Sequence, residues 1–346
     1  MFENQRRTEL HDLGEFGLIE HITSYFKNQN KESVFGIGDD AAVLDFGEKY
    51  TLVSTDHFIE GIHFDLTFHP LRHLGYKAVA AAVSDICAMN GNPLQILVNI
   101  GLSNRFSLEA VEEIYSGIQI ACEKYAVDLI GGDTSSSPRG LYLSVTAIGC
   151  VDKDKVTYRK GAEANDLLVL TGDIGGAYMG LQILEREKKV FMEHPEMQPD
   201  LERHDYIVGR QLRPDARKDV IQILAEKEIL PTSMIDVSDG VASEIHHLGK
   251  QSGVGFQVFE NKLPIDPQTV ERAIEFGLNP SIAALNGGED YELLFTIKQG
   301  DYEKIKHHPD MTVIGHATEL VGKYNLITES GNSFEIQAQG WQHFQG

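Results

Sequence analysis

The feature that most constrains the fold of this chain is an alternation of short apolar runs with segments of helical periodicity. Apolar residues that recur every three or four positions predict amphipathic helices, whereas short continuous apolar runs predict buried strands. In the first half, Leu71–Asn90 and Leu108–Tyr125 have the helical pattern, with Ser107 as the expected N-cap. Strands are expected at Tyr50–Ser54, Leu94–Leu102, Val127–Ile130 and Leu141–Val151. This alternation predicts an α/β fold with helices and strands in separate layers (α+β layered).

A charged segment without apolar periodicity, residues 152–166, divides the chain. The alternation resumes beyond it, so we expect two α/β domains of ordinary size, residues 1–152 and 153–346. In the second domain, strands are expected at Leu167–Leu170, Met234–Val237, Val254–Val258 and Tyr291–Ile297. Helices are expected from Ala177, over Ala216–Lys227, from Val241 and over Pro267–Phe276. The strongly charged stretch Glu185–Asp205 is expected to be an exposed helical excursion.

The chain is acidic, with 52 Asp and Glu residues against 30 Lys and Arg and a formal net charge of −22. Proteins that bind nucleic acid usually present a dense basic patch. The sequence has no such cluster, so binding to duplex nucleic acid is not expected. The acidity suits cation binding, although an ordinary acidic surface explains it more simply.

The cysteines and the hydropathy indicate where the protein works. Cys87, Cys122 and Cys150 form no C-x-x-C pair, and an odd, sparse set suits a reducing compartment. The N-terminal stretch lacks the apolar core of a signal peptide. No run approaches the about 18 apolar residues of a membrane helix. We therefore expect a cytoplasmic protein that makes no use of a membrane.

Carboxylates beside glycine or other small residues are the most informative feature for function. They lie in six segments: Gly36–Val43, Ser54–Asp56, Ser84–Asp85, Gly131–Thr134, Asp236–Gly240 and Asn286–Asp290. We expect these segments at strand ends, where catalytic groups of α/β proteins tend to lie. Small neighbours let a ligand approach the backbone closely.

Asp85 gives the strongest single indication of a site. It shares the apolar stripe of its predicted helix with Leu74, Ala78 and Ala81. A carboxylate on a buried face is costly unless a cation compensates its charge. A metal site and a buried salt bridge both satisfy this requirement.

The other segments are ambiguous when taken singly. The adjacent carboxylates of Gly36–Val43 suit either a Mg²⁺ site or a surface turn. Gly131–Thr134 suggests a tight turn whose amides face a phosphate, with Asp133 as a metal ligand, but such turns are common in hairpins. Asp239 suits a metal site, but a helix N-cap or a turn residue explains it equally well.

Taken together, these segments supply at least eight carboxylates. A fold that gathered them would suffer strong repulsion unless several divalent cations were bound. Several cations with a polyanion between them indicate a nucleotide polyphosphate. The sequence contains no P-loop, dinucleotide-binding or protein-kinase motif, no Cys/His zinc cluster and no nucleophile elbow.

A few further residues allow both a structural and a functional interpretation. His63, as a lone histidine, is more often an ordinary core or surface residue than a functional one. Trp341, the only tryptophan, either anchors the C-terminal tail or stacks on an aromatic ligand. Arg159 is either solvated or a ligand contact, and the arginines of Arg210–Arg217 are either surface charges or a phosphate-facing cluster.

An ordered set of motifs covers nearly the whole chain. In the one-letter code it comprises GEFGLI, GIGDDAAV, STDHFIEGIHF, KAVAAAVSDICAMNGNP, LIGGDT, RKGA, LLVLTGDIGGA, RQLRPDAR, IDVSDG, NGGEDYELLF and GWQHF. This set resembles the thiamine-monophosphate kinase family, which belongs to the superfamily of aminoimidazole ribonucleotide synthetase and selenophosphate synthetase. SDICAMNGNP and NGGEDYELLF are the most specific parts of the match.

The resemblance implies an aminoimidazole ribonucleotide synthetase-like fold of two α/β domains, of which the first mediates a homodimer. It implies that ATP lies between elements of both domains together with several Mg²⁺ ions. The implied reaction is direct in-line transfer of the γ-phosphoryl group of ATP to thiamine monophosphate, the last step of thiamine diphosphate biosynthesis.

The resemblance also implies roles for individual residues, matched motif by motif. The catalytic residues are Asp40, Asp85, Asp133 and Asp236. The metal ligands are Asp40, Ser54, Thr55, Asp56, Asp85, Asp133, Asp236 and Asp239. The nucleotide contacts are Gly132, Asp133, Arg159 and Ser238. The contacts to thiamine monophosphate are His63, Glu289 and Trp341.

Two other functions stay open at the level of sequence. One is another ATP-dependent reaction of the superfamily, although the chain lacks an N-terminal reactive cysteine, and NGGEDYELLF and GWQHF match the thiamine kinases better. The other is a non-catalytic cation or nucleotide sensor. A sensor of this kind is expected to have lost metal ligands, and none of the matched carboxylates is missing.

Overall fold

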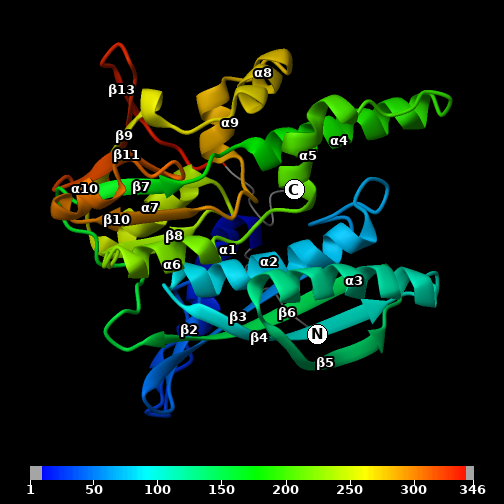
Figure 1. Cartoon of the computed structure of the whole chain (residues 1–346), viewed down its shortest axis with the longest axis horizontal. Coiled ribbons are helices and arrows are strands. Elements are labelled where there is room, and N and C mark those ends of the chain that lie inside the picture. The colour runs from blue at the N-terminus through cyan, green and yellow to red at the C-terminus, as the bar shows by residue number, and fades with distance from the viewer. Residues whose placement is uncertain (1–9, 340–346) are drawn as a thin grey trace, which may run out of the picture.

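The computed structural model describes residues 10–339, which form two sheets flanked by helices (Figure 1). The first sheet contains β1 (Ser33–Phe35), β2 (Ala42–Asp45), β3 (Lys49–Ile59), β4 (Asn92–Leu102), β5 (Asp128–Ser136) and β6 (Tyr142–Asp152). The second contains β7 (Leu167–Thr171), β8 (Ser233–Asp236), β9 (Gly255–Phe259), β10 (Leu293–Ile297), β11 (Met311–Thr318), β12 (Tyr324–Ile327) and β13 (Ser333–Glu335). The charged segment 152–166 connects the two sheets, and the α/β class is confirmed.

The helices follow the same division. Those that precede β7 are α1 (Leu10–Thr23), α2 (Leu71–Ala88) and α3 (Leu108–Tyr125). Those that follow it are α4 (Gly176–Glu193), α5 (Asp205–Leu212), α6 (Lys218–Glu226), α7 (Val241–Ser252), α8 (Pro267–Glu275), α9 (Pro280–Asn286) and α10 (Tyr302–Ile305). Short 3₁₀ turns cover Glu202–His204, Glu260–Lys262 and Gln299–Asp301. No helix in this part of the chain is both long enough and apolar enough to cross a membrane.

The first sheet has the strand order β1-β2-β3-β6-β4-β5 and is antiparallel except between β4 and β5. Side chains alternate between its two faces, as in any strand. Leu52 and Phe58 of β3 are buried on the face that α2 covers. Thr55 and His57, on the opposite face of the same strand, are exposed.

The second sheet has the order β13-β12-β9-β11-β7-β10-β8 and is covered on both faces. On one face Leu170 and Leu294 pack in a cluster with Ile245 of α7. On the other face Val169 and Phe295 pack with residues of α6 and α10. Both faces of β7 and β10 are apolar because helices cover both, as in a buried central strand.

Helix α2 lies between the first sheet and the second half of the molecule (Figure 1). Every residue from Leu74 to Ala88 except Asp85 is buried. The helix packs against β3, β6 and α3 on one side and against β8 and α6 on the other. A helix that is apolar nearly all round is typical of such a buried position.

Several sequence predictions agree with the observed elements. Helix α3 has the predicted bounds, and Ser107 Oγ accepts a hydrogen bond from the Ala110 amide at 3.4 Å as its N-cap. Helix α7 begins at Val241 as expected. The excursion expected over Glu185–Asp205 is α-helical as far as Glu193, has a 3₁₀ turn at Glu202–His204, and includes the buried side chain of Glu187.

The segment Gly131–Thr134 differs from the prediction, because it lies inside β5 and not in a tight turn. Gly132 pairs with Val98 in the parallel ladder with β4. Its φ is +146°, and a Cβ there would lie 1.8 Å from the Val98 carbonyl oxygen. The glycine therefore permits a close approach between two strands. The prediction failed because a run of glycine and polar residues lacks the apolar pattern of a strand.

Helices α2 and α3 cross closely at two glycines, and this crossing can be tested. A Cβ on Gly117 would lie 1.8 Å from the carbonyl oxygen of Arg72. We expect Gly117→Ala to lower the free energy of unfolding by about 1–3 kcal/mol through overpacking. Gly209→Ala in α5 is the matched control, because its Cβ would meet nothing within 4 Å and helical alanine is favoured over glycine. Urea unfolding of both variants measures the difference, and equal stability would contradict the close crossing.

Candidate functional site

Three carboxylates from separate elements meet where the two halves of the molecule join. Asp40 precedes β2, Asp85 lies in the last turn of α2, and Asp236 is the last residue of β8. One oxygen from each lies within 4.8 Å of one from each of the others. Asp40 and Asp236 are buried, and Asp85 is half-buried. We call these three residues the acidic cluster.

Hydroxyl groups and one cation partly satisfy the acidic cluster. Ser84 Oγ donates to Asp236 Oδ2 at 2.7 Å, and Ser54 Oγ donates to Asp85. Arg159 pairs with Asp40 Oδ1 at 2.6 Å. Among the described residues Asp85 forms no ion pair, so the buried salt bridge that the sequence left open is not what compensates its charge.

The electrostatics of the acidic cluster are unfavourable without a further cation. Burial and the neighbouring carboxylates raise the pKa of Asp85 well above its ordinary value. Burial and then the charge of Asp40 raise the pKa of Asp236 to about 8. The same two causes raise the pKa of Asp56, in β3, to about 6. Several carboxyls of the site therefore resist ionisation together.

The donor set fits a hard divalent cation. Asp40 Oδ2 is buried and has no hydrogen-bond partner in the described part of the chain. Carboxylate and hydroxyl oxygens are the ligands that Mg²⁺ prefers, and it often keeps several waters. The acidic cluster supplies three carboxylates, and Ser54 and Asp56 lie in the adjacent β3.

Arg159 is held in place on both its side chain and its backbone. Its amide donates to the Asp39 carboxylate at 3.1 and 3.2 Å, and its guanidinium binds Asp40. The adjacent acidic residues Asp39 and Asp40 thus fix one arginine between them. The interpretation of Arg159 as a solvated residue is wrong.

The second loop of the site is built from residues 236–240. Ser238 is half-buried, and its carbonyl oxygen accepts a hydrogen bond from the Glu289 amide at 2.7 Å. The N-cap of α7 is Gly240, so the interpretation of Asp239 as the N-cap is wrong. The Asp239 amide instead donates to Glu244 Oε1 at 3.1 Å.

Other predicted site residues lie apart from the acidic cluster. The Thr55 hydroxyl contacts that of Thr146 at 3.1 Å on the exposed face of the first sheet. Asp133 is exposed in the edge strand β5, opposite Asn99. His63 follows β3, and its Nδ1 accepts a hydrogen bond from the Ile59 amide at 3.1 Å.

Gly132 and Asp133 do not lie at a strand end, and Thr55 and Asp56 lie within β3. The prediction that the acidic segments occupy strand ends therefore holds for Asp236. It fails for these residues and for Ser84 and Asp85, which lie in α2. Trp341 lies outside the described residues, and its role stays a prediction.

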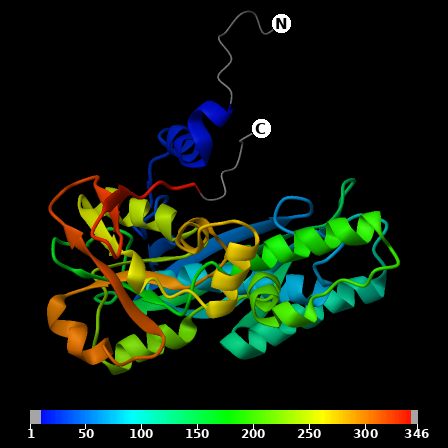
Figure 2. The same cartoon turned by 90° about the horizontal axis from the view of Figure 1, so that it is seen from above.

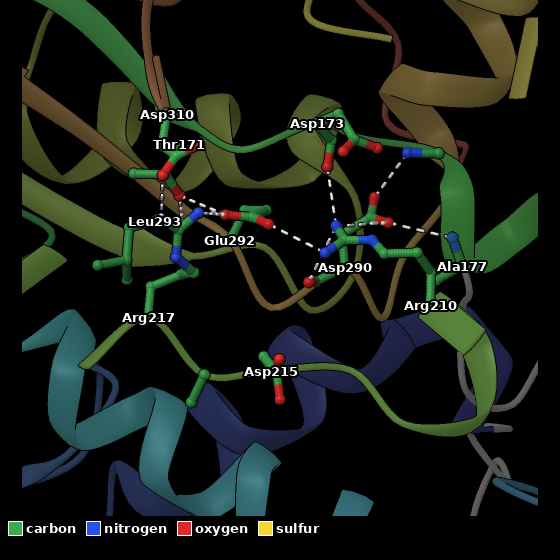
Figure 3. Close-up of polar contacts among 12 residues, drawn as sticks. Thr171, Asp173, Ala177, Arg210, Asp215, Arg217, Asp290, Glu292, Leu293 and Asp310 are labelled. Atoms are coloured by element: carbon green, nitrogen blue, oxygen red, sulfur yellow. Dashed lines mark hydrogen bonds and ion pairs between the residues drawn. The ribbon is translucent and has the colours of Figure 1, made fainter. Parts of the chain in front are cut away.

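Arg210 and Arg217 take part in a buried network, drawn in Figure 3, whereas Arg213 is exposed. Glu292 forms ion pairs with Arg210 at 3.0 Å and with Arg217 at 2.6 Å, and it accepts a hydrogen bond from Thr171 Oγ1 at 2.6 Å. Asp290 accepts the amides of Gly175 at 2.7 Å and Ala177 at 3.2 Å, at the start of α4. Arg210 and Arg217 therefore anchor carboxylates, and are not surface charges.

Glu244 belongs to the site as well, although it was not among the residues predicted from the sequence. This residue is buried beside Asp239, and burial followed by the charge of Asp239 raises its pKa well above the ordinary value. It lies on the apolar face of α7 with Val241, Ile245 and Leu248. The stripe argument that identified Asp85 would also have identified Glu244.

The raised carboxyl pKa values predict how stability depends on pH and Mg²⁺. In the folded metal-free protein Asp236 keeps its proton up to about pH 8, whereas an unfolded Asp loses it near pH ~3.9. The folded state thus binds more protons, and this contribution to stability is lost as the pH rises from about 4 to 8. In EDTA we expect Tm to fall over this range more steeply for wild type than for Asp236→Asn.

Mg²⁺ should raise the wild-type Tm more at pH 8 than at pH 5, because protons compete for the same oxygens. Differential scanning fluorimetry with EDTA or MgCl₂ measures both effects. A wild-type slope equal to that of Asp236→Asn would contradict the electrostatic description of the acidic cluster.

Known proteins with a similar sequence and fold indicate what kind of site this is. Residues 38–151 match the family model "AIR synthase related protein, N-terminal domain". The solved structure "AaThiL complexed with AMPPCP and TMP" is 32% identical, with a TM-score of 0.83 over 98% of this chain and 100% of that one. "Hydrogenase Maturation Protein HypE in complex with ATP" has a TM-score of 0.68 over 96% of this chain and 98% of that one, and at 19% identity it shares only the fold.

Curated relatives extend the similarity over almost the full length. Thiamine-monophosphate kinase of Aquifex aeolicus is 32% identical over 97% of this chain and 99% of its own. The enzyme of Bacillus subtilis is 32% identical over 96% and 100%, and that of Escherichia coli K12 is 32% identical over 96% and 98%. A chain that aligns end to end with these enzymes at such identity, and that folds as they do, belongs to the thiamine-monophosphate kinase family.

Proposed function

We propose that this protein transfers the γ-phosphoryl group of ATP to thiamine monophosphate, giving thiamine diphosphate and ADP, in a Mg²⁺-dependent reaction. The observation that carries this proposal is the convergence of Asp40, Asp85 and Asp236 from three elements, in a chain that aligns end to end with thiamine-monophosphate kinases. The reaction would be the last step of thiamine diphosphate biosynthesis. A cytoplasmic location accords with the three free cysteines.

In the proposed direct transfer, the protein forms no covalent bond to either substrate. An oxygen of the acceptor phosphate forms a bond to the γ-phosphorus while the β–γ bridging bond breaks, and ADP leaves with the electron pair. The acceptor is already ionised near neutral pH, so a strong general base is unnecessary. The main obstacle is repulsion between two polyanions, and positioning with charge neutralisation is the main source of catalysis in such transfers.

Mg²⁺, when bound, would supply the positive charge that neutralises this repulsion. Asp40, Asp85 and Asp236 would hold one ion, with Ser54 and Asp56 in the adjacent β3. Thr55 and Asp133, which lie apart from the acidic cluster, and Asp239 would bind further ions, as the resemblance to the family implies. Arg159, Gly132 and Ser238 would contact the nucleotide. Glu289, His63 and Trp341 would contact thiamine monophosphate.

Two alternatives are weaker. If the protein catalysed a different ATP-dependent reaction of the superfamily, its 32% identity to three thiamine-monophosphate kinases over nearly their full length would be unexplained. A non-catalytic sensor would not need the full set of carboxylates, and the three of the acidic cluster still converge. A panel of phosphoryl acceptors distinguishes the first alternative, and turnover excludes the second.

The proposal is tested by incubating the purified protein with thiamine monophosphate, ATP and Mg²⁺ and separating the products by chromatography. We expect thiamine diphosphate and ADP in equal amounts, and no product with thiamine as the acceptor. Asp85→Asn should lower kcat at least about a hundredfold, because it removes a charge that organises the transfer, while the circular dichroism spectrum stays unchanged. ATP hydrolysis without diphosphate formation would refute the kinase, and near-normal turnover in Asp85→Asn would refute the role of Asp85.

We also propose that the first sheet mediates a homodimer. Among the described strands, the edge strand β5 pairs only with β4, and its Leu129 and Ile130 are 44% and 57% exposed. Ile59 of β3 and Tyr142 of β6, which pair with each other level with the far end of β5, are further exposed apolar residues of this sheet. An edge strand with unpaired backbone groups and exposed apolar side chains invites association, and a second copy would cover it symmetrically.

The dimer can be tested by placing a charge on its expected interface. Light scattering coupled to size-exclusion chromatography should give a dimer for wild type and a monomer for Ile130→Asp. Ile274→Asp is the matched control, because Ile274 is 63% exposed on α8 and outside the first sheet. A monomeric wild type, or dissociation by both variants alike, would contradict this interface.

A further inference from the structure

We propose that Lys77 is a positioning residue for the phosphoryl acceptor: from the buried side of α2 it holds the carboxylate of Glu289 in the orientation in which Glu289 meets thiamine monophosphate. The inference rests on the proposed function. No motif of the sequence analysis assigned Lys77 a role.

The environment of Lys77 is unusual for a lysine. Its side chain is 0% exposed, and lysine is almost never fully buried unless it is paired. The Nζ atom lies 2.9 Å from Glu289 Oε1 and donates to the Gln211 carbonyl oxygen at 2.9 Å. The ammonium group is thus shared between α5 and the loop that precedes β10.

Gln211 completes the arrangement around Glu289. Its Nε2 donates to Glu289 Oε2 at 2.7 Å, and its own side chain is buried. The two oxygens of Glu289 therefore have different donors, one charged and one neutral. Two fixed donors on one carboxylate determine its direction, and charge-assisted hydrogen bonds are the stronger kind.

The backbone around Glu289 is fixed independently of Lys77. The Glu289 amide donates to the Ser238 carbonyl at 2.7 Å, and the Tyr291 amide donates to that of Val237 at 2.9 Å. Asp290 is buried and bound to the start of α4. Glu289 itself has a φ of +63°, a strained value for a residue with a side chain. The loop thus holds Glu289 beside residues 237–238, and Lys77 sets only its carboxylate.

Although its backbone is held by the loop and its carboxylate by Lys77, Glu289 is still available to a ligand. Its side chain is 29% exposed, whereas those of Asp290 and Glu292 are 0% and 3% exposed. A partly exposed carboxylate with a fixed direction can accept hydrogen bonds from an aminopyrimidine or face a cationic thiazolium. Loss of the charged donor would leave the carboxylate free to turn, and small misplacements of a positioning group are costly.

Lys77→Met tests the inference, because methionine keeps the length of the side chain and removes the charge. We expect KM for thiamine monophosphate to rise about tenfold or more, with KM for ATP changed less than about twofold. In a Glu289→Gln background the same substitution should change KM for thiamine monophosphate less than about twofold, because Lys77 acts through Glu289. Lys124→Met, on the exposed side of α3, is the matched control and should change neither constant.

Several results would overturn the inference. One is an unchanged KM for thiamine monophosphate in folded Lys77→Met, and another is an equal effect in both backgrounds. If Lys77→Met does not fold, Gln211→Leu gives the same readout, because it removes the donor to Glu289 Oε2 and leaves the backbone carbonyl for Lys77. An unchanged KM for thiamine monophosphate in that variant would also overturn the inference. Wild-type turnover of thiamine monophosphate is measured alongside, so failure of the proposed function is recognised separately.

Discussion

The burial of helix α2 between the two halves of the molecule is the constraint on which the rest of the structure depends. One side of the helix closes the core of the first sheet, and the other packs against β8 and α6. The same helix carries Lys77, Ser84 and Asp85, which lie at the junction between the two halves. Figure 2 views the molecule from above, with α1 lying apart from the sheets toward the N-terminus. Since α2 is enclosed on both sides, these polar groups are held by packing against both halves.

The convergence of buried carboxylates makes the junction between the two halves of the molecule electrostatically unfavourable. Asp40, Asp85 and Asp236 converge with one arginine beside them, and burial disfavours their charged forms. A protein tolerates such repulsion where a ligand compensates it, and strongly perturbed carboxyls are common at functional sites. The junction is thus prepared for cations and polyanions together, and poorly suited to remain empty at neutral pH.

The loop before β10 shows how neighbouring carboxylates acquire different tasks. Glu289, Asp290 and Glu292 are close in sequence and similar in chemistry. Asp290 and Glu292 are buried against amides and arginines (Figure 3). The side chain of Glu289, in contrast, is partly exposed. Burial of the two anchors fixes the loop, and a fixed loop can hold Glu289 in a strained backbone conformation.

The sequence by itself determined the α/β class, most element positions and the candidate carboxylates, because apolar periodicity and the placement of charges on apolar stripes are local properties of the chain. It marked Asp85 through its helix stripe, and by the same argument it could have marked Glu244. It misplaced Gly131–Thr134, because a polar strand is stabilised by pairing with β4 and leaves no periodic signal. Only the tertiary structure decided that Asp40, Asp85 and Asp236 converge, that Arg210 and Arg217 anchor buried carboxylates, and that Lys77 meets Glu289. These pairs are far apart in sequence, and their contacts follow from the packing of α2 against both halves of the molecule, which no local pattern encodes.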